Sequence, residues 1–558
     1  MHHKKYFRVA VALVLTVTLS SLIGSHKANA HAPVAFIIQP YYGAHDYYQR
    51  WVAGNHYGID FMMDWEPVLA AAAGNVEVAG WFNATCHDED KPGCNSTSLA
   101  GFGLHMRIDH GPAEGHKYRS IYGHLSVVKS GLGQISQGQW IGTSGDSGYS
   151  DPQHLHFEIR HNGTAQSKAV NPDDEGGVSL WIQGEWAGWN GEPSQPKARK
   201  RLVTLGSYGE TVVDDTSSQS NEFRKGVYPS TVCPPLSCPY WYLVTANGYS
   251  GDYYWTSDNN NTASYWAEWH PNLPAFTLYE VAAHIPCTAD AINEYDTSPT
   301  WSAPYTIFHE DGTTSVIVDQ LTSSRDGACN QWLGLGVYKG NAGSDLFVNL
   351  TDATQETGIG VSRKVLADAV KFTATTVGPF EGENWRKKIA RSGDSWRSAT
   401  EKPQYTGTGY AETFPNDGSS ILNNYITTSP ELIYNVVFPT TGTYYIWIRG
   451  YGGSGGDDSI HAGFDGQGPP SADRIAGCGW SAAPGSWIWC NTTIDNNFQD
   501  LATITIDTPG YHTFHLWMRE DGFRVDRIFI AIQPDYNVSN PPNEKPYIFP
   551  GDDMGTND

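Results

Sequence analysis

The chain has little positive charge. Its 558 residues include 35 Lys and Arg against 59 Asp and Glu, which gives a formal net charge of −24 at pH 7. A protein that binds nucleic acid needs a cationic face for the phosphates, so this composition argues against a nucleic-acid partner. It argues equally against capture by anionic polymers through charge alone, and it favours solubility outside the cell.

Several motifs are also missing. After residue 30, no apolar run reaches the length that a membrane-spanning helix needs, so no membrane span is expected. Neither the phosphate-binding pattern GxxxxGK[ST] nor the HExxH motif of a helix-borne zinc site occurs. A G-x-S-x-G pattern at 452–456 precedes DDSIHAGFDG, which is typical of a strand. A nucleophile elbow requires a helix there, so we interpret the glycines as a hairpin loop.

The first thirty residues have the pattern of a secretory signal peptide. Basic residues precede an apolar run, and an A-x-A cleavage signal ends it. The basic residues are Lys4, Lys5 and Arg8, and the cleavage signal is Ala28-Asn29-Ala30. We therefore expect a secreted, extracellular protein that begins at His31. Removal of this segment, which also contains Lys27, lowers the formal net charge to −28.

The cysteines fall into even sets along the chain. An exported chain with eight cysteines is expected to form disulfides. The predicted pairs are Cys86–Cys94, Cys233–Cys238, Cys287–Cys329 and Cys478–Cys490. The four cysteines between 233 and 329 allow three connectivities, so the pairing within that set stays open. A second zinc site is the alternative, but the spacing of the histidines does not support it.

The most informative stretch is HLHFEIR, residues 154–160. Its polar positions His154, His156 and Glu158 alternate with apolar ones. That is the period of a β-strand with one apolar face, so both histidines share the polar face.

A second motif, HYGIDF at 56–61, alternates in the same way. His56, Gly58 and Asp60 share a face, and Gly58 leaves open space between the other two side chains. Two strands that offer nitrogen and oxygen donors can close three corners of a tetrahedron around zinc. A single histidine would be better interpreted as a surface or core residue. The combination of two motifs in an exported chain favours a metal site.

These motifs resemble the H-x-x-x-D and H-x-H signature of the lysostaphin/LytM-type zinc metallopeptidases. The segments PVLAAAAGNV, IYGHLS, QGQWIGTSGDSG, HLHFEI and a closing Asn171-Pro172 follow in the family's order. The resemblance covers roughly residues 31–175 and implies an all-β peptidase domain with one catalytic zinc. The insert at about Phe82–Gly101 is longer and more acidic than the family pattern, and we expect it to reshape the cleft.

By that resemblance, the zinc ligands are His56, Asp60 and His156, and the other two histidines at the reacting centre are His124 and His154. Zinc with three protein ligands keeps a position for water, whose pKa it lowers towards about 7. We expect His154 to carry a proton to the leaving amine and His124 to hold or polarise the intermediate. The sequence alone does not rank these two histidines.

Glu158 keeps two interpretations at this point. It is either a partner that orients an imidazole of the site or a solvated carboxylate on the strand. Four further histidines of the region have no spacing that requires a metal, and we interpret them as structural or surface residues. They are His105, His110, His116 and His161.

The whole chain is expected to be all-β: a lysostaphin-type β-sheet peptidase domain followed by two jelly-roll-like β-sandwich modules. The predicted boundaries are a signal peptide at 1–30, the peptidase domain at 31–178, a linker at 179–208, the two modules at 209–376 and 377–535, and a disordered tail at 536–558.

The first module resembles the golvesin C-terminal-like domain, most specifically in its ending WLGLG…ADAVKF. That domain is similar to carbohydrate-binding β-sandwiches. Several aromatic residues of the module are candidates for stacking on sugar rings, although core packing is the more common role of an aromatic residue in a sandwich. The candidates are Trp241, Tyr253, Tyr254, Trp255, Trp266 and Trp269.

The second module resembles a jelly-roll carbohydrate-binding module in its EGENW start, its GTYYIWIRG strand and its MREDGFRVDRIFI ending. Such modules often hold a structural calcium, for which Glu381, Glu383 or Asp526 are candidate ligands. Salt-bridged surface carboxylates are the alternative interpretation of these residues.

The sequence therefore predicts a secreted, monomeric zinc metalloendopeptidase. Its expected substrate is the peptide part of bacterial peptidoglycan, at cross-bridges or stem peptides, or a Gly-rich protein. The C-terminal modules would bind glycan and raise the local substrate concentration. The alternatives are a cell-wall or polysaccharide-binding protein with a degenerate peptidase fold, and a regulator that scaffolds other hydrolases.

Overall fold

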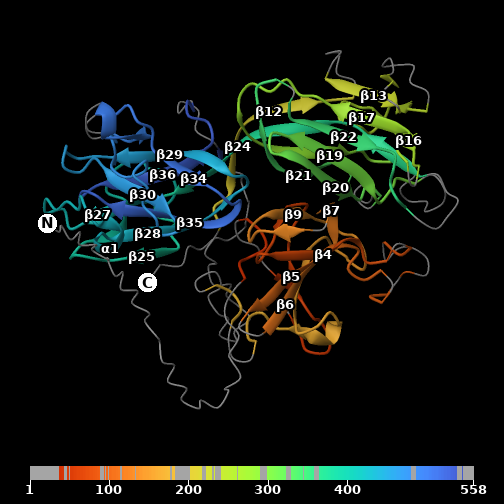
Figure 1. Cartoon of the computed structure of the whole chain (residues 1–558), viewed down its shortest axis with the longest axis horizontal. Coiled ribbons are helices and arrows are strands. Elements are labelled where there is room, and N and C mark those ends of the chain that lie inside the picture. The colour runs from red at the N-terminus through yellow and green to blue at the C-terminus, as the bar shows by residue number, and fades with distance from the viewer. Residues whose placement is uncertain are drawn as a thin grey trace, which may run out of the picture. The chain divides into compact units, whose positions relative to one another are not determined.

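Strands make up most of the structure, a computed structural model (Figure 1). The residues it describes run from 37 to 536 and include 543–544, except for 43–46, 50, 84, 88–93, 95, 99, 114–115, 132, 176–178, 183–201, 216–221, 229–230, 233–239, 260–261, 289–297, 322–328, 344, 357–362 and 479–485. Within these residues, no helix is both long enough and apolar enough to cross a membrane. The all-β fold class predicted from the sequence is confirmed.

The peptidase region, drawn in orange in Figure 1, is built on one twisted sheet. Its strand order is β1-β2-β10-β6-β5-β4-β8, and neighbouring strands run antiparallel. These strands are β1 (Tyr47–Gln49), β2 (Ile59–Phe61), β4 (Gly74–Trp81), β5 (Leu104–Ala113), β6 (His116–Gly123), β8 (Gln134–Ile135) and β10 (Leu155–His161). The short strand β11 (Ala169–Val170) pairs with β10, and β9 (Trp140–Ser144) pairs with both β3 (Pro67–Leu69) and β7 (Leu125–Lys129).

Strand β10 has the apolar face that its sequence predicts. Leu155, Phe157 and Ile159 are fully buried in the core of this region, together with Ile59 and Phe61 of β2. Burial of such side chains is what fixes the register of a strand, because a slip by one residue would turn all of them away from the core. The core therefore fixes which way the polar positions of β10 point.

The second region, drawn mainly in green, is a β-sandwich (Figure 1). One sheet contains β21 (Gln331–Gly340), β18 (Thr277–Ile285), β24 (Val370–Glu381) and β12 (Leu205–Val213). The other contains β13 (Phe223–Val227), β17 (Tyr265–Trp269), β22 (Phe347–Thr351), β19 (Ala303–His309) and β20 (Gly312–Val318), with β14 (Thr231–Val232) at its edge. Side chains of both sheets share one hydrophobic core. A small third sheet joins β15 (Tyr242–Val244), β16 (Tyr253–Ser257) and β23 (Lys364–Ala367).

The third region, drawn in blue, also packs two sheets around one core (Figure 1). One has the order β25-β28-β35-β30-β31-β33, and in the other β36 pairs with β24, β27 and β29. The strands are β25 (Lys387–Ile389), β26 (Ser395–Ala399), β27 (Tyr410–Phe414), β28 (Glu431–Phe438), β29 (Gly442–Tyr451), β30 (Ile460–Phe464), β31 (Ile475–Ala476), β32 (Ile488–Cys490), β33 (Thr492–Thr493), β34 (Thr503–Ile506), β35 (Gly510–Met518) and β36 (Arg524–Ala531). One short helix, α1 (Tyr425–Thr428), precedes β28.

Three of the predicted disulfides are present. Cys86–Cys94, Cys287–Cys329 and Cys478–Cys490 have their Cα atoms 5.4, 4.7 and 5.2 Å apart, respectively. The fourth predicted pair, Cys233–Cys238, lies outside the described residues, as does the signal peptide. Within the tail that was expected to be disordered, β37 (Asn543–Glu544) pairs with β12.

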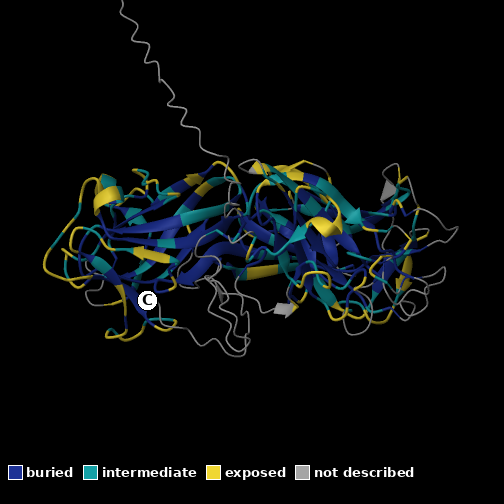
Figure 2. Ribbon diagram, turned by 90° about the horizontal axis from the view of Figure 1, so that it is seen from below, coloured by how far each residue is buried: buried dark blue, intermediate teal, exposed yellow. Residues whose placement is uncertain are grey.

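Most of the aromatic candidates for sugar stacking belong to the core. Trp255 alone of the six is half-buried, while the other five are at least 94% buried. Figure 2 shows the general pattern, with dark blue buried strands and exposed residues concentrated in the loops. The alternative role, core packing, therefore holds for Trp241, Tyr253, Tyr254, Trp266 and Trp269.

The calcium expected in the second module is not supported. Glu381 pairs with Arg527 at 2.9 Å, and Asp526 pairs with Arg449. One oxygen of Glu383 accepts three hydrogen bonds, from the backbone and hydroxyl of Thr408 and from the backbone of Gly409. Cationic side chains already neutralise two of the three carboxylates, which is the salt-bridge alternative, although all three carboxylates are buried rather than at the surface.

The packing of β10 generates a first prediction. The fully buried Phe157 ring contacts Tyr122 and Trp181, with ring centroids 5.4 and 5.8 Å apart. Phe157→Ala should destabilise the peptidase region by about 3–5 kcal/mol, because it leaves a cavity in the core. Hydrogen exchange of β10 and β6 amides in the full chain measures this. The matched control is Phe82→Ala, at a side chain that is 43% exposed, which should leave those amides protected. Equal protection in both variants would contradict this account of the core.

Candidate metal centre

Strand β10 lies between the two segments that carry the other predicted site residues. His156 is opposite Asp60 of β2 on one side and opposite Gly123 of β6 on the other. His56 precedes β2, and His124 follows β6 directly. Antiparallel pairing therefore brings residues that are about a hundred positions apart into adjacent places on one sheet.

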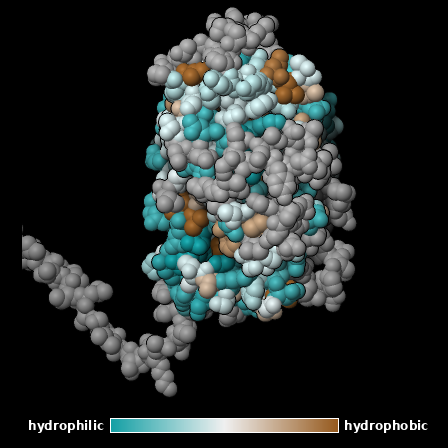
Figure 3. Space-filling view, turned by 90° about the vertical axis from the view of Figure 1, so that its right-hand side faces the viewer, coloured by the Kyte–Doolittle hydropathy of each residue, from teal (hydrophilic) through white to brown (hydrophobic). Residues whose placement is uncertain are grey.

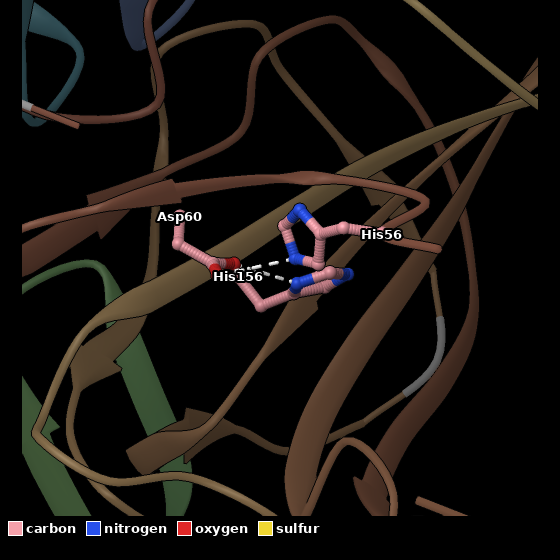
Figure 4. A group of neighbouring side chains, drawn as sticks. All are labelled: His56, Asp60 and His156. Atoms are coloured by element: carbon pink, nitrogen blue, oxygen red, sulfur yellow. Dashed lines mark hydrogen bonds and ion pairs between the residues drawn. The ribbon is translucent and has the colours of Figure 1, made fainter. Parts of the chain in front are cut away.

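The three predicted ligands meet in the structure. One ligand atom from each of His56, Asp60 and His156 lies within 4.8 Å of the others. The two carboxylate oxygens of Asp60 divide between the imidazoles: Oδ1 is 2.8 Å from Nδ1 of His156, and Oδ2 is 3.1 Å from Nε2 of His56. Figure 4 shows both rings directed at this carboxylate. Two imidazoles and one carboxylate are the ligand types that zinc prefers.

The position of the His156 ring fits a metal at this point. Its Nδ1 faces the other two predicted ligands, while Nε2, on the other side of the ring, is 3.8 Å from Oε2 of Glu158. A Cβ added at Gly58 would lie 2.4 Å from Cε1 and 2.6 Å from Nε2 of His156, so only glycine leaves room for this ring. The open space predicted at Gly58 is thus filled by the imidazole of a predicted ligand.

The charges of the group are strongly coupled. Burial alone would raise the pKa of Asp60, but hydrogen bonds from His156 and His56 hold that pKa well below its usual range. Burial would lower the pKa of His156, but its hydrogen bond to Asp60 and the nearby Glu158 raise it to about 9. The carboxylate is therefore ionised and stabilises a positive charge beside it. A bound cation would take the place of the imidazolium proton, because a histidine ligates a metal only in its neutral form.

His154 lies beside the three predicted ligands, and its neutral ring carries the proton on Nδ1. Its Nδ1 is 2.8 Å from the carbonyl oxygen of Pro152, which can only accept, so Nδ1 carries the proton. In the neutral ring the lone pair is then on Nε2, which is 3.6 Å from Oδ1 of Asp60. Burial lowers the pKa of His154, and the charge of Asp60 opposes that effect. Ser150, whose hydroxyl is 3.2 Å from Nδ1, also contacts the ring.

His124 is held in the same tautomer by a different carbonyl. Its Nδ1 lies 2.7 Å from the oxygen of Ser147, and its own backbone N–H donates to Phe102. The residue has a φ of 61°, a left-handed conformation that is uncommon outside glycine. Its ring centroid is 4.7 Å from that of His154. Burial and the neighbouring histidines lower the pKa of His124 well below its ordinary value.

Glu158 is a buried, paired carboxylate. It is fully buried, and the guanidinium of Arg160 donates to both of its oxygens, at 2.6 and 3.2 Å. Its Oε2 lies 3.8 Å from Nε2 of His156. The interpretation as a solvated carboxylate is wrong, and the position fits a residue that orients the ligand histidine.

The predicted ligands and the two neighbouring histidines line a cleft of about 870 Å³. They are His56, Asp60, His156, His124 and His154. Sequence reasoning missed several of its walls, including Phe102, Arg107 and the loop residues Tyr149 and Asp151. The insert also contributes walls, as expected, through Phe82, Thr97 and Gly101. Tyr149 is 42% exposed at the cleft, so it is accessible to a substrate.

The four histidines that were expected to be structural or surface residues differ in their surroundings. His110 contacts Ala73 and Ser120, and His116 contacts His161, each through hydrogen bonds within the fold. Their structural interpretation is consistent with these contacts. His105 differs, because it lines the cleft and is 94% buried. Burial lowers the pKa of His105 to about 4, so it is neutral at pH 7.

Comparison with known proteins matches three segments of the chain. Residues 54–172 match Peptidase family M23, residues 240–374 match the Golvesin C-terminal domain, and residues 379–539 match the Glycosyl hydrolase family 115 C-terminal domain. The first two matches lie within the regions predicted at 31–178 and 209–376, and the third begins within the region predicted at 377–535 and ends four residues beyond it. The region boundaries themselves remain a prediction.

Curated relatives match a short part of the chain. Over 122 residues, or 21% of the chain, this protein is 35% identical to the glycyl-glycine endopeptidase ALE-1 of Staphylococcus capitis and to lysostaphin of Staphylococcus simulans. The chain spans 28% of the length of the former and 21% of the latter. Among solved structures, the catalytic domain of lysostaphin from S. simulans is 30% identical, with a TM-score of 0.18, over 25% of this chain and 86% of that one.

The predicted ligands His56, Asp60 and His156, together with His124 and His154, all lie within the segment that matches Peptidase family M23. The chain therefore carries a domain of Peptidase family M23, followed by a Golvesin C-terminal domain and a domain like the Glycosyl hydrolase family 115 C-terminal domain.

Proposed function

We propose that this chain is a secreted zinc-dependent metalloendopeptidase that hydrolyses peptide bonds in peptidoglycan cross-bridges or stem peptides. The observation that carries the proposal is the convergence of His56, Asp60 and His156 in one cleft with His124 and His154. The named activity of the relative from S. capitis, a glycyl-glycine endopeptidase, directs the proposal to glycine at the scissile bond.

Each residue of the group has a role in the proposed hydrolysis. A zinc ion held by His56, Asp60 and His156 would supply an activated water and polarise the scissile carbonyl. Nε2 of His154 accepts a proton from the attacking water and later donates it to the leaving amine. The geometry suits this exchange, because Pro152 fixes the proton on Nδ1 and leaves Nε2 as the acceptor.

Proximity to Asp60 distinguishes the two histidines. The Asp60 carboxylate is 3.6 Å from Nε2 of His154 and stabilises the protonated ring, so His154 is the better proton carrier. His124 lies beside that ring, with centroids 4.7 Å apart, and its bond from Nδ1 to the carbonyl of Ser147 leaves Nε2 for the substrate. In this role it positions or polarises the reacting group, as oxyanion-binding residues do.

The second region offers a surface for the proposed glycan binding. Tyr240 and Tyr242 are 58% and 47% exposed. Tyr242 stacks on Trp255 with centroids 4.5 Å apart, and Tyr240 lies 5.3 Å from Tyr265. Exposed aromatic faces suit contact with sugar rings, and a glycan-bound module would hold the peptidase near its substrate. We propose these exposed tyrosines as glycan contacts because five of the six aromatic candidates suggested by the sequence are buried.

The alternative function is a wall-binding protein with a degenerate site. The complete set of predicted ligands and neighbouring histidines in one cleft counts against it.

Removal of the proton carrier should separate zinc binding from catalysis. In His154→Ala, zinc content should stay stoichiometric while kcat falls by about 10²–10⁴-fold, since general acid–base transfer contributes that much. Zinc analysis and cleavage of a pentaglycine peptide measure the two properties. His116→Ala, at a histidine bonded to His161 away from the cleft, should keep both. Full activity in His154→Ala would refute the assigned role.

A methyl group at Gly58 should disturb the ligand without removing it. In Gly58→Ala, the new Cβ meets the His156 ring at 2.4 Å, so the ring must move and zinc affinity should fall at least 10-fold. Competition with a chromogenic zinc chelator gives the affinity. Gly133→Ala is the matched control, because a Cβ there has no neighbour within 4 Å. Unchanged zinc affinity in Gly58→Ala would show that His156 is not a ligand.

A further inference from the structure

A second group of carboxylates lies in the golvesin-like region, far along the chain from the peptidase motifs. Asp214 and Asp215 follow β12, and Asp368 connects β23 to β24. Strands β12 and β24 are antiparallel, with Val213 opposite Val370. Continuation of this register brings Asp215 opposite Asp368. One carboxylate oxygen from each of the three aspartates lies within 4.8 Å of the others.

The burial of this group is what sets it apart from an ordinary acidic surface. Asp215 is 94% buried and Asp368 is 98% buried. Both carboxylate oxygens of Asp215 are inaccessible to solvent and accept no hydrogen bond. An ionised carboxylate that is buried without a partner has a large free-energy cost, so the fold alone does not account for it.

The other groups around Asp215 do not remove that cost. Asp368 accepts hydrogen bonds from Nδ1 of His284 at 2.7 Å and from the backbone of Tyr249, which fix its orientation. Lys225 is the cation whose charge acts on Asp215, but its ammonium lies 3.7 Å from the centroid of the Tyr254 ring. It makes no hydrogen bond to either oxygen of Asp215.

The local electrostatics agree with a missing positive charge. Burial, followed by contact with Asp214 and the charges of Asp368 and Asp252, raises the pKa of Asp215 to about 10. The same kinds of cause, burial and then the charge of Asp214, raise the pKa of Asp252. Without a cation, the group must take up a proton instead.

We infer that Asp214, Asp215 and Asp368 form a binding site for a hard divalent cation, with calcium as the expected ion. The donors are all carboxylate oxygens, which favour calcium or magnesium over zinc. Calcium suits the site better, because it accepts irregular arrangements of six to eight oxygens, whereas magnesium demands a near-ideal octahedron. The bound ion would tie the end of β12 to the start of β24 and so stabilise the sandwich.

The test uses the full chain after removal of metal ions and dialysis into zinc, so that the peptidase site is filled. Calorimetric titration with CaCl₂ and with MgCl₂ gives affinity and stoichiometry, and thermal unfolding gives the change in Tm. The expected result is one calcium ion per chain, a higher Tm with calcium, and weaker binding of magnesium. If magnesium binds as tightly as calcium, the choice of ion is wrong.

Asp215→Asn localises the site. It keeps the shape of the side chain and removes one charge, so calcium affinity should fall at least 10-fold while zinc content and cleavage stay unchanged. The variant should also be no less stable than the wild type without calcium, because the asparagine side chain and the protonated Asp215 of the calcium-free wild type are both neutral. Asp473→Asn, at a partly exposed carboxylate in the third region, should bind calcium as the wild type does.

If Asp215→Asn does not fold, Asp214→Asn, at the half-buried edge of the group, serves in its place with the same expected loss. Absence of calcium and magnesium binding by the wild type at millimolar concentration would overturn the inference and leave a protonated Asp215. Unchanged calcium affinity in the variant would overturn it as well.

Discussion

The pairing of β10 with β2 positions His156 to hydrogen-bond Asp60. The rest of the proposed site depends on this pairing. The two side chains lie opposite each other because the apolar face of β10 is fixed in the core. The same register sets His156 beside Gly123, and His124, which directly follows Gly123, lines the cleft. A shift of one residue in β10 would turn its polar positions into the apolar core and turn Phe157 towards the polar cleft, so core packing and site geometry stabilise the same register.

The sequence predicts those site residues that belong to short motifs with alternating polar and apolar positions. The alternation in HLHFEIR and HYGIDF gave the shared faces of His156 and Asp60, and the resemblance to a peptidase family added His124. Arg160 lies two positions beyond Glu158 on the same face of the strand, so their ion pair was readable but was overlooked. Phe102 and Tyr149 reach the cleft through long-range folding, and no spacing in the sequence marks them.

In the two C-terminal regions, the sequence predicts the fold class better than it predicts candidate binding residues. Their all-β character follows from short alternating segments, and the disulfides Cys287–Cys329 and Cys478–Cys490 follow from the even sets of cysteines. The exposure of single aromatics does not, because tertiary packing decides which face of a strand is covered: Trp269 is buried whereas Tyr242 is half exposed. Among the described residues on the face drawn in Figure 3, most are hydrophilic or intermediate, and the hydrophobic ones form small separate groups.

The zinc content of the purified protein, combined with cleavage assays, tests the central claim most directly. The account predicts one zinc per chain at the peptidase site. It also predicts that the protein releases new amino termini from purified peptidoglycan or a pentaglycine peptide, that a chelator stops this release, and that added zinc restores it. A protein that holds no zinc and cleaves neither substrate would contradict the account and favour a binding protein with a degenerate site.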